Sequence, residues 1–176
     1  HGAVGKGKIG LLHPMSMPYD ARPAHIVATR RTDRLPGESN TSRSVVTLTA
    51  QTASDDVIGV QSLLYDTPIT SIERMLAALD NSSMIGLREH RCSGFVVTLG
   101  DGSSRRVLEE ADVARLQAAY PHIHNIRYHW FGYNIGTAGG HNAMVDLLPE
   151  PTHVIFSNPD VVVEPRAIWR MLEAFD

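Results

Sequence analysis

The sequence predicts an α/β protein with a mainly parallel sheet and helices on both of its faces. Four apolar stretches of strand length alternate with four stretches of helical periodicity, which is the pattern of successive βα units. A polar turn follows each expected strand, at Asp66, Asp101, Asn134 and Asp160. Because parallel strands end at one edge of their sheet, these turns are expected to meet where ligands bind in such folds.

The first two units are the most regular. A strand is expected over residues 57–64, followed by a helix with a capping box in residues 70–73 and an apolar stripe at Ile69, Ile72, Leu76 and Leu79. The second unit places a strand at 94–99, a turn at 100–104 and a helix over 108–120, with Val113, Leu116 and Tyr120 on one face. Each is a strand, turn and helix unit.

The third unit begins with Ile126, Tyr128 and Trp130, which alternate as in a half-buried strand. A glycine-rich turn at 133–142 then leads into a helix through Met144, Val145 and Leu148. Trp130 lies on the apolar phase of its strand, as Trp169 does in its helix. Both are therefore expected in the core.

The fourth unit has a strand at 153–156, the turn Ser157-Asn158-Pro159-Asp160, and a second apolar strand at 161–163. A helix is expected from Pro165, with its apolar positions at Ile168, Met171, Leu172 and Phe175. Asp160 would then lie between two buried strands, where a carboxylate needs a partner to offset its desolvation.

Residues 1–55 are expected to form an N-terminal extension or a partial domain, and residues 56–176 the regular part. Prolines at 14, 18, 23 and 36 suggest turns around short strands at 25–28 and 44–50. With 176 residues the chain can hold one domain with a core, or one domain plus an extension.

Composition excludes several classes of protein. No apolar run approaches the roughly 20 residues that cross a bilayer, and a net charge of -3 gives no electrostatic case for nucleic acid. The single cysteine, Cys92, excludes an intrachain disulfide and a cysteine-based zinc site and fits a reducing compartment. His122 and His124 lack a third zinc ligand at suitable spacing, so a surface loop explains them.

Asp101 and Asp160 each have a functional and a structural interpretation. Asp101, between two glycines, could reach the N–H of a base or the hydroxyls of a ribose, or Gly-Asp-Gly-Ser-Ser is only a good turn. Asp160 could bind a hard divalent cation such as Mg²⁺ or Mn²⁺, which prefers oxygen ligands, or is only a turn residue after Pro159.

The glycine-rich turn has the same two interpretations. Gly136, Gly139 and Gly140 would let a diphosphate approach the backbone at a helix N-terminus. Alternatively Asn134 makes an Asx turn and Thr137 caps the helix. The spacing is not that of a dinucleotide-binding fold and no P-loop Lys follows. His141 either contacts a phosphate or faces solvent.

Two uncommon segments stand in order, separated by one helix. They are Tyr133-Asn134-Ile135-Gly136-Thr137-Ala138-Gly139-Gly140-His141-Asn142 and Ser157-Asn158-Pro159-Asp160-Val161. The first is similar to the Asn-x-Gly-x-x-Gly-Gly-x-Asn segment of family-2-type glycosyltransferases with the GT-A fold, especially rhamnosyltransferase-like members, and the second resembles their Asn-Pro-Asp version of Asp-x-Asp. The resemblance covers about residues 56–176, with looser matches at 63–66 and 99–103.

The resemblance implies the Rossmann-like GT-A fold and transfer of a sugar from a dTDP- or UDP-linked donor to an acceptor hydroxyl, with inversion. It implies metal assistance by Mg²⁺ or Mn²⁺ held by Asp160, since a cation offsets the charge that develops on a diphosphate leaving group. The donor would be held by Tyr65, Asp66, Asp101, Asn134, Gly136, Gly139, Gly140, Asn142 and Asn158.

The same resemblance implies a cytoplasmic enzyme of polysaccharide biosynthesis with a glycan or lipid-linked acceptor. That role is compatible with peripheral association at the inner face of a membrane. Two features depart from the family pattern. Asn158 replaces the first acid of Asp-x-Asp, and the family's catalytic base lies in a later half, beyond Asp176, so no base is named. The alternative is a nucleotide-binding or interaction module of the same fold that does not catalyse transfer.

Overall fold

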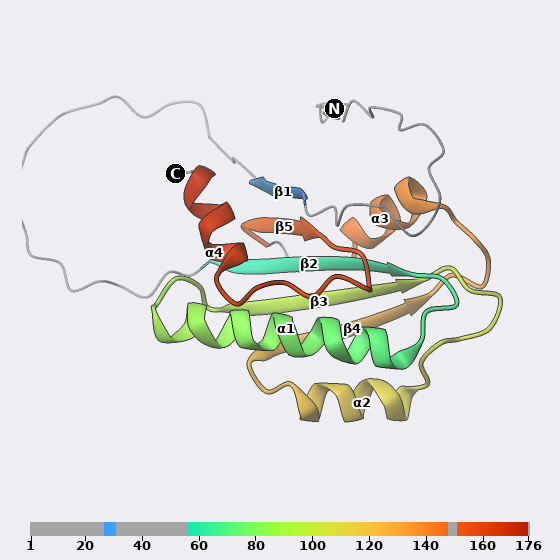
Figure 1. Ribbon diagram of the computed structural model, residues 1–176. Helices are drawn as coiled ribbons and strands as arrows, with labels where there is room; N and C mark the ends of the chain where they lie inside the picture. Colours follow the sequence, from blue (N-terminus) through green and yellow to red (C-terminus); the bar gives the residue numbers. More distant parts are fainter. Residues whose placement is uncertain (1–26, 31–55, 148–150, 176) are drawn as a thin grey trace, which may run out of the picture.

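The computed structural model describes residues 27–30, 56–147 and 151–175 (Figure 1). Its five strands are β1 (Val27–Arg30), β2 (Val57–Leu64), β3 (Gly94–Asp101), β4 (Ile123–Trp130) and β5 (His153–Phe156). They form one sheet in the order β1-β5-β2-β3-β4. Strands β2 to β5 pair in parallel, and β1 runs antiparallel to β5 at the edge. The predicted mainly parallel sheet is confirmed.

Helices cover both faces of this sheet, as predicted. They are α1 (Ile69–Arg88), α2 (Glu110–Ala119), α3 (Thr137–Val145) and α4 (Ala167–Leu172), which continues into the 3-10 turn η2 (Glu173–Phe175). The connections through α1 and α2 step outward from β2 to β4, whereas α3 returns across the sheet to β5. Right-handed crossovers therefore place α3 on the face opposite α1 and α2 (Figure 1).

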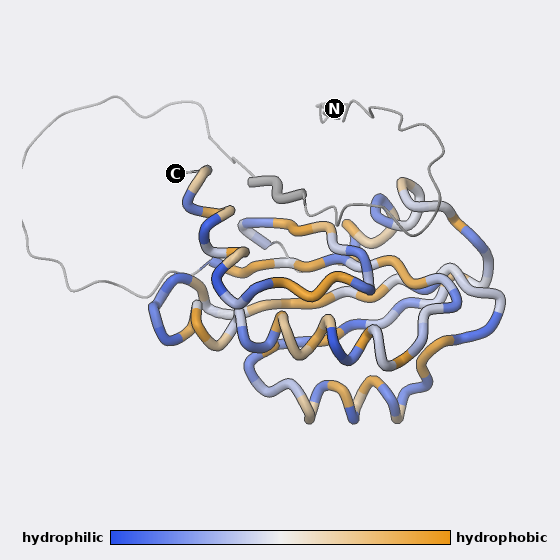
Figure 2. The backbone as a smooth tube through the Cα atoms, in the orientation of Figure 1, coloured by the Kyte–Doolittle hydropathy of each residue, from blue (hydrophilic) through white to orange (hydrophobic). Residues whose placement is uncertain are grey.

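The main core lies between the sheet and α1. Alternate residues of β2, namely Ile58, Val60 and Leu64, are buried in it together with Ile72 and Leu76 of α1. Figure 2 shows the hydrophobic residues running along the central strands, while the helices at the surface alternate between hydrophobic and hydrophilic positions. Each helix therefore has one apolar face to bury, and the central strands are apolar on both faces. Helices accordingly pack as layers on the sheet.

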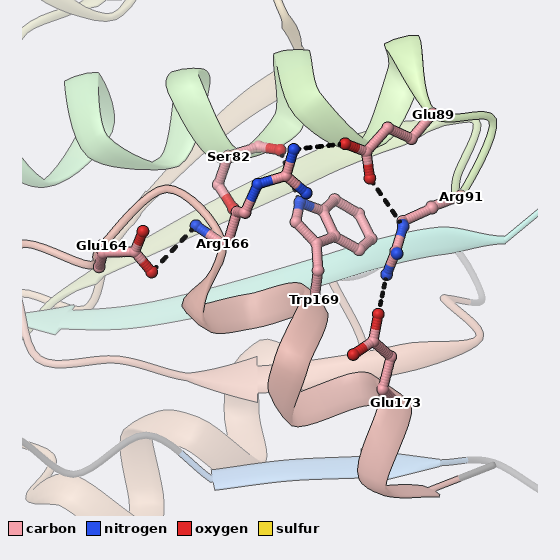
Figure 3. A network of polar contacts seen from close by, with 7 residues as sticks. All are labelled: Ser82, Glu89, Arg91, Glu164, Arg166, Trp169 and Glu173. Atoms are coloured by element: carbon pink, nitrogen blue, oxygen red, sulfur yellow. Dashed lines mark hydrogen bonds and ion pairs between the residues drawn. The ribbon is translucent and has the colours of Figure 1, made fainter.

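Helix α4 packs against α1 through Trp169, which is 3% exposed, as predicted for the core. Its ring centroid is 5.6 Å from that of Phe95 on β3. Around it, Arg166 bonds to Glu89 at 2.7 Å, Glu89 pairs with Arg91 at 3.0 Å, and Arg91 pairs with Glu173 (Figure 3). These contacts hold the segment after β5 against the end of α1.

Several expectations about individual elements are wrong. Helix α1 begins at Ile69, with Pro68 at the N-cap position and no side-chain cap, so the capping box expected at 70–73 lies inside the first turn. Residues 161–163 form no strand, although Val161 and Val163 are buried and Val162 is 61% exposed. Val145 is the last residue of α3 and is 52% exposed.

Other expectations are shifted or lie outside the described residues. The short strand expected at 25–28 is β1, two residues later, and the one at 44–50 is outside the described residues. Leu148 and the side chain of Phe175 are outside them too. Trp130 is only partly buried, with the guanidinium of Arg106 5.1 Å from its ring centroid. No helix in the described part of the chain is long and apolar enough to cross a membrane.

Candidate functional site

The turns after the four parallel strands meet at one edge of the sheet. The Gly102 N–H donates to the Leu64 carbonyl at 3.0 Å, and the Phe131 N–H donates to the Asp101 carbonyl at 2.8 Å. The Asp66 N–H donates to the Ser103 hydroxyl at 2.8 Å. The turns after β2, β3 and β4 are thus tied to one another, and the Ser157 N–H, at the start of the turn after β5, donates to the Gln61 carbonyl of β2 at 2.9 Å. The predicted convergence at the carboxyl ends of the parallel strands is confirmed.

A cleft of about 590 Å³ lies at this edge, between the turn after β2 and the turn after β5. Four of the residues predicted as a site line it, namely Tyr65 and Asp66 from the first turn and Asn158 and Asp160 from the second. Val162 lines it too, with an exposed side chain. Side chains that are far apart in the sequence therefore share one cavity.

Asp66 has an unusual backbone conformation. Its φ is +47°, in the left-handed region that L-residues seldom adopt. The turn is held by the bond from the Asp66 N–H to Ser103 and by a 3.1 Å bond from the Tyr65 N–H to the Thr67 hydroxyl. This turn leaves the Tyr65 side chain 58% exposed at the cleft. Left-handed residues held by their surroundings are frequent at binding sites.

Asp160 is exposed, which corrects the argument that it must be desolvated between two strands. Because residues 161–163 form no strand, the turn opens toward solvent. The carboxylate therefore needs no protein partner. Its location in the cleft, rather than its burial, makes it a candidate ligand. Asn158 is exposed beside it.

The charge of the cleft limits what it can bind. The described residues that line it include the carboxylates of Asp66 and Asp160 and no Lys, Arg or His. A diphosphate would be repelled unless a cation came with it. The carboxylate and amide oxygens suit Mg²⁺ or Mn²⁺, although in the described part of the chain no group of three or more His, Cys, Asp or Glu residues is placed to hold a metal ion. Ligand phosphates would have to complete the coordination.

Asp101 does not line this cleft. It is fully buried, and its carboxylate accepts the N–H groups of Ser103 and Val107 at 2.9 Å each and the hydroxyl of Tyr128. Both oxygens are thus engaged by the loop that they shape, which is the structural interpretation of the Gly-Asp-Gly turn. Burial, and then the bond to Asp101, raise the pKa of Tyr128.

The glycine-rich turn starts α3 without a side-chain cap. Gly136 occupies the N-cap position with a φ of +70°, which glycine adopts without strain. The Asn134 side chain accepts the Gly136 N–H at 3.0 Å, so the predicted Asx turn is confirmed. Thr137 is the first helical residue rather than the cap.

Gly140 lies where α3 packs closely against the sheet. A Cβ atom there would lie 2.5 Å from Cδ1 of Leu63 on β2. At Gly139 a Cβ would lie 3.1 Å from Cγ1 of Ile135, and at Gly136 it would meet nothing within 4 Å. Neither these glycines nor the exposed Asn142 line the cleft, and their role in donor binding stays a prediction.

His141 faces the sheet rather than solvent. Its Nδ1 is 3.2 Å from Oε1 of Gln61, and its ring centroid is 4.8 Å from that of Phe156. Burial lowers the pKa of this imidazole. His122 instead contacts Asp80 through Nδ1 at 2.8 Å. His124 is exposed, but it lies in β4 rather than in the surface loop expected for the pair.

Two parts of the site had no clear signal in the sequence. Ser103, whose hydroxyl positions Asp66, looked like an ordinary turn residue, and only its place after Gly102 could have suggested a contact with the preceding turn. Pro68 and Ser71 also line the cleft, because the first turn of α1 lies there. Neither a protein-family profile, nor a curated protein, nor a solved structure matches this chain.

Proposed function

We propose that residues 56–176 are the nucleotide-sugar-binding part of an inverting glycosyltransferase with the GT-A fold. The observation that carries this proposal is the shared cleft at the carboxyl edge of the parallel sheet. It unites Tyr65 and Asp66 with Asn158 and Asp160 in about 590 Å³, a volume in the range of small-molecule sites. The resemblance of residues 133–142 and 157–161 to family motifs supports the same function.

The chemistry of the cleft suits a nucleoside diphosphate that carries a cation. The exposed ring of Tyr65 and the side chain of Val162 offer apolar surface to a base. The Asp66 carboxylate can accept hydrogen bonds from a base N–H or a ribose hydroxyl. Asp160, with the oxygen of Asn158, would hold Mg²⁺ or Mn²⁺, which would offset the charge of the diphosphate.

Titration calorimetry of UDP and dTDP, each with and without Mn²⁺, tests this assignment. Wild type should bind one of them only with the cation, and Asp160→Ala should weaken that binding about tenfold or more. Asp146→Ala is the matched control, because Asp146 is an exposed carboxylate at the C-terminal end of α3 and does not line the cleft. Binding that needs no metal and is unchanged by Asp160→Ala would sink the metal assignment.

A thermal-shift scan of nucleotide sugars would then identify the donor, since a ligand that binds the folded state raises its apparent stability. Incubation of that nucleotide sugar with acceptors then distinguishes a glycosyltransferase from a non-catalytic nucleotide-binding module. Release of nucleoside diphosphate that depends on an acceptor hydroxyl supports transfer. Stable binding without release would instead favour a nucleotide-binding module.

A further inference from the structure

A row of polar side chains crosses the sheet beneath α3. Gln61 on β2 is the register partner of Thr98 on β3, and Thr98 is the partner of Arg127 on β4. Adjacent parallel strands lie about 4.8 Å apart, and register partners project to the same face. The three side chains therefore form one continuous row, which we call the polar row.

The contacts of α3 show that it covers this row from end to end. His141 contacts Gln61, and the carbonyl of Leu147, just after the helix, accepts a bond from the Arg127 guanidinium. Between them, Met144 packs against Gly100. Gly100 and Thr98 are two positions apart on β3, so Met144 lies on the same face of the sheet as the Thr98 side chain. The helix thus lies over β2 and β3, and the residues just after it reach β4 at the end of the row.

Each member of the polar row has a buried atom without a hydrogen-bond partner in the described structure. These atoms are Nε2 of Gln61, Oγ1 of Thr98 and Nε of Arg127. Gln61 and Thr98 are fully buried. A buried polar group without a partner costs about 1–3 kcal/mol, and nearly all such groups in folded proteins are bonded to protein or ordered water. Three of them on adjacent strands need a common explanation.

We infer that α3 covers an internal water site built by the polar row. One water can accept from an N–H, exchange a bond with the Thr98 hydroxyl, and span the spacing of neighbouring strands with two bonds of ordinary length. An anion is less suited, because the Arg127 guanidinium already bonds the carbonyl at the C-terminal end of α3, where the helix dipole is negative. This inference does not depend on the proposed function.

A crystal structure of the full chain tests the inference directly. We expect density for at least one ordered water within hydrogen-bond distance of two of the three atoms. If the electron density shows no ordered water between α3 and the sheet at the polar row, the inference is overturned, whatever the stability of the variants. A crystal grown in bromide distinguishes a bound anion from a water. An anomalous peak at the polar row would mean that an anion occupies it, and would overturn the assignment to water.

Thr98→Val, which keeps the shape of the side chain and removes its hydroxyl, provides the solution test. If the hydroxyl bonds a water, the unfolding equilibrium constant should rise about fivefold, the change expected for one lost hydrogen bond. The effect should also be coupled to that of Gln61→Met, because both side chains bind the same water. An unchanged or lower unfolding constant for Thr98→Val, with additive effects in the double variant, would overturn the inference.

Discussion

The indole N–H of Trp169 donates to the backbone carbonyl of Ser82 at 2.9 Å, which joins α4 to the middle of α1 (Figure 3). Helix α4 follows the turn that carries Asn158 and Asp160. This contact therefore anchors the segment that leads away from that turn. The indole also lies against Gly86. A Cβ atom at that glycine would be 2.0 Å from Cζ2 of Trp169.

Gly86→Ala and Trp169→Phe should both destabilise the fold, and their effects should be coupled. The added methyl of Gly86→Ala displaces the indole and should cost about 1–3 kcal/mol of unfolding free energy. Trp169→Phe removes the bond to Ser82 and should cost about 1–2 kcal/mol. The smaller ring makes room for the methyl, so Gly86→Ala should cost less in the Trp169→Phe background. Urea denaturation of the four proteins checks this, and purely additive effects would contradict the contact.

Asp101→Asn should destabilise the loop after β3 strongly. Three donors converge on this carboxylate, from Ser103, Val107 and Tyr128, and an amide would turn one of its own donors toward them. We expect a loss of about 2–3 kcal/mol in urea denaturation, because buried groups lose their partners. Tyr128→Phe removes one of these donors, together with the acceptor of the Leu108 N–H at 3.5 Å, and should cost about 1 kcal/mol.

Tyr128→Phe also tests whether Asp101 has the predicted role in donor binding. Because its carboxylate is fully engaged and lies outside the cleft, Tyr128→Phe should leave the affinity for a nucleoside diphosphate with Mn²⁺ within about twofold under conditions where it is folded. A tenfold loss of affinity in folded Tyr128→Phe would show that this loop contacts the ligand after all.

The strands were predictable because their signal is local. The apolar runs at 57–64 and 153–156 coincide with β2 and β5, since each run is bounded by polar turns. The exposure of Asp160 was not predictable, because the apolar residues 161–163 have the composition of a strand but no neighbouring strand to pair with. Gly140 also illustrates the limit, as its neighbour Leu63 lies on a distant element.

The two adjacent glycines of α3 should respond differently to alanine. Gly140→Ala places a methyl 2.5 Å from Cδ1 of Leu63, so either the Leu63 side chain or α3 must shift, and the unfolding free energy should fall by about 1–3 kcal/mol. Gly139→Ala meets only Ile135, at 3.1 Å, and gains up to about 1 kcal/mol of helix propensity. It should be close to neutral. Thermal or urea denaturation checks the pair, and equal losses would show that the packing against Leu63 is not the cause.

The last prediction concerns the pH dependence contributed by His141. Burial of its ring beside Phe156 lowers the pKa in the folded state, so the unfolded chain binds this proton more readily. Above the unfolded pKa of about 6.5 the imidazole is neutral in both states and its contribution to stability is complete. As the pH falls below that value, the unfolded state takes up the proton first, and the unfolding free energy decreases.

Urea denaturation between pH 8 and pH 5 measures this contribution as a slope. His141→Gln keeps a polar side chain near Gln61 but cannot titrate, so its stability should fall less steeply below about pH 6.5 than that of wild type. His124→Asn, which removes an exposed imidazole instead, is the control. The same slope in His141→Gln as in wild type would mean that His141 takes up its proton equally in the folded and unfolded chains. The contact between α3, Gln61 and Phe156 would then have to be looser than the structure shows.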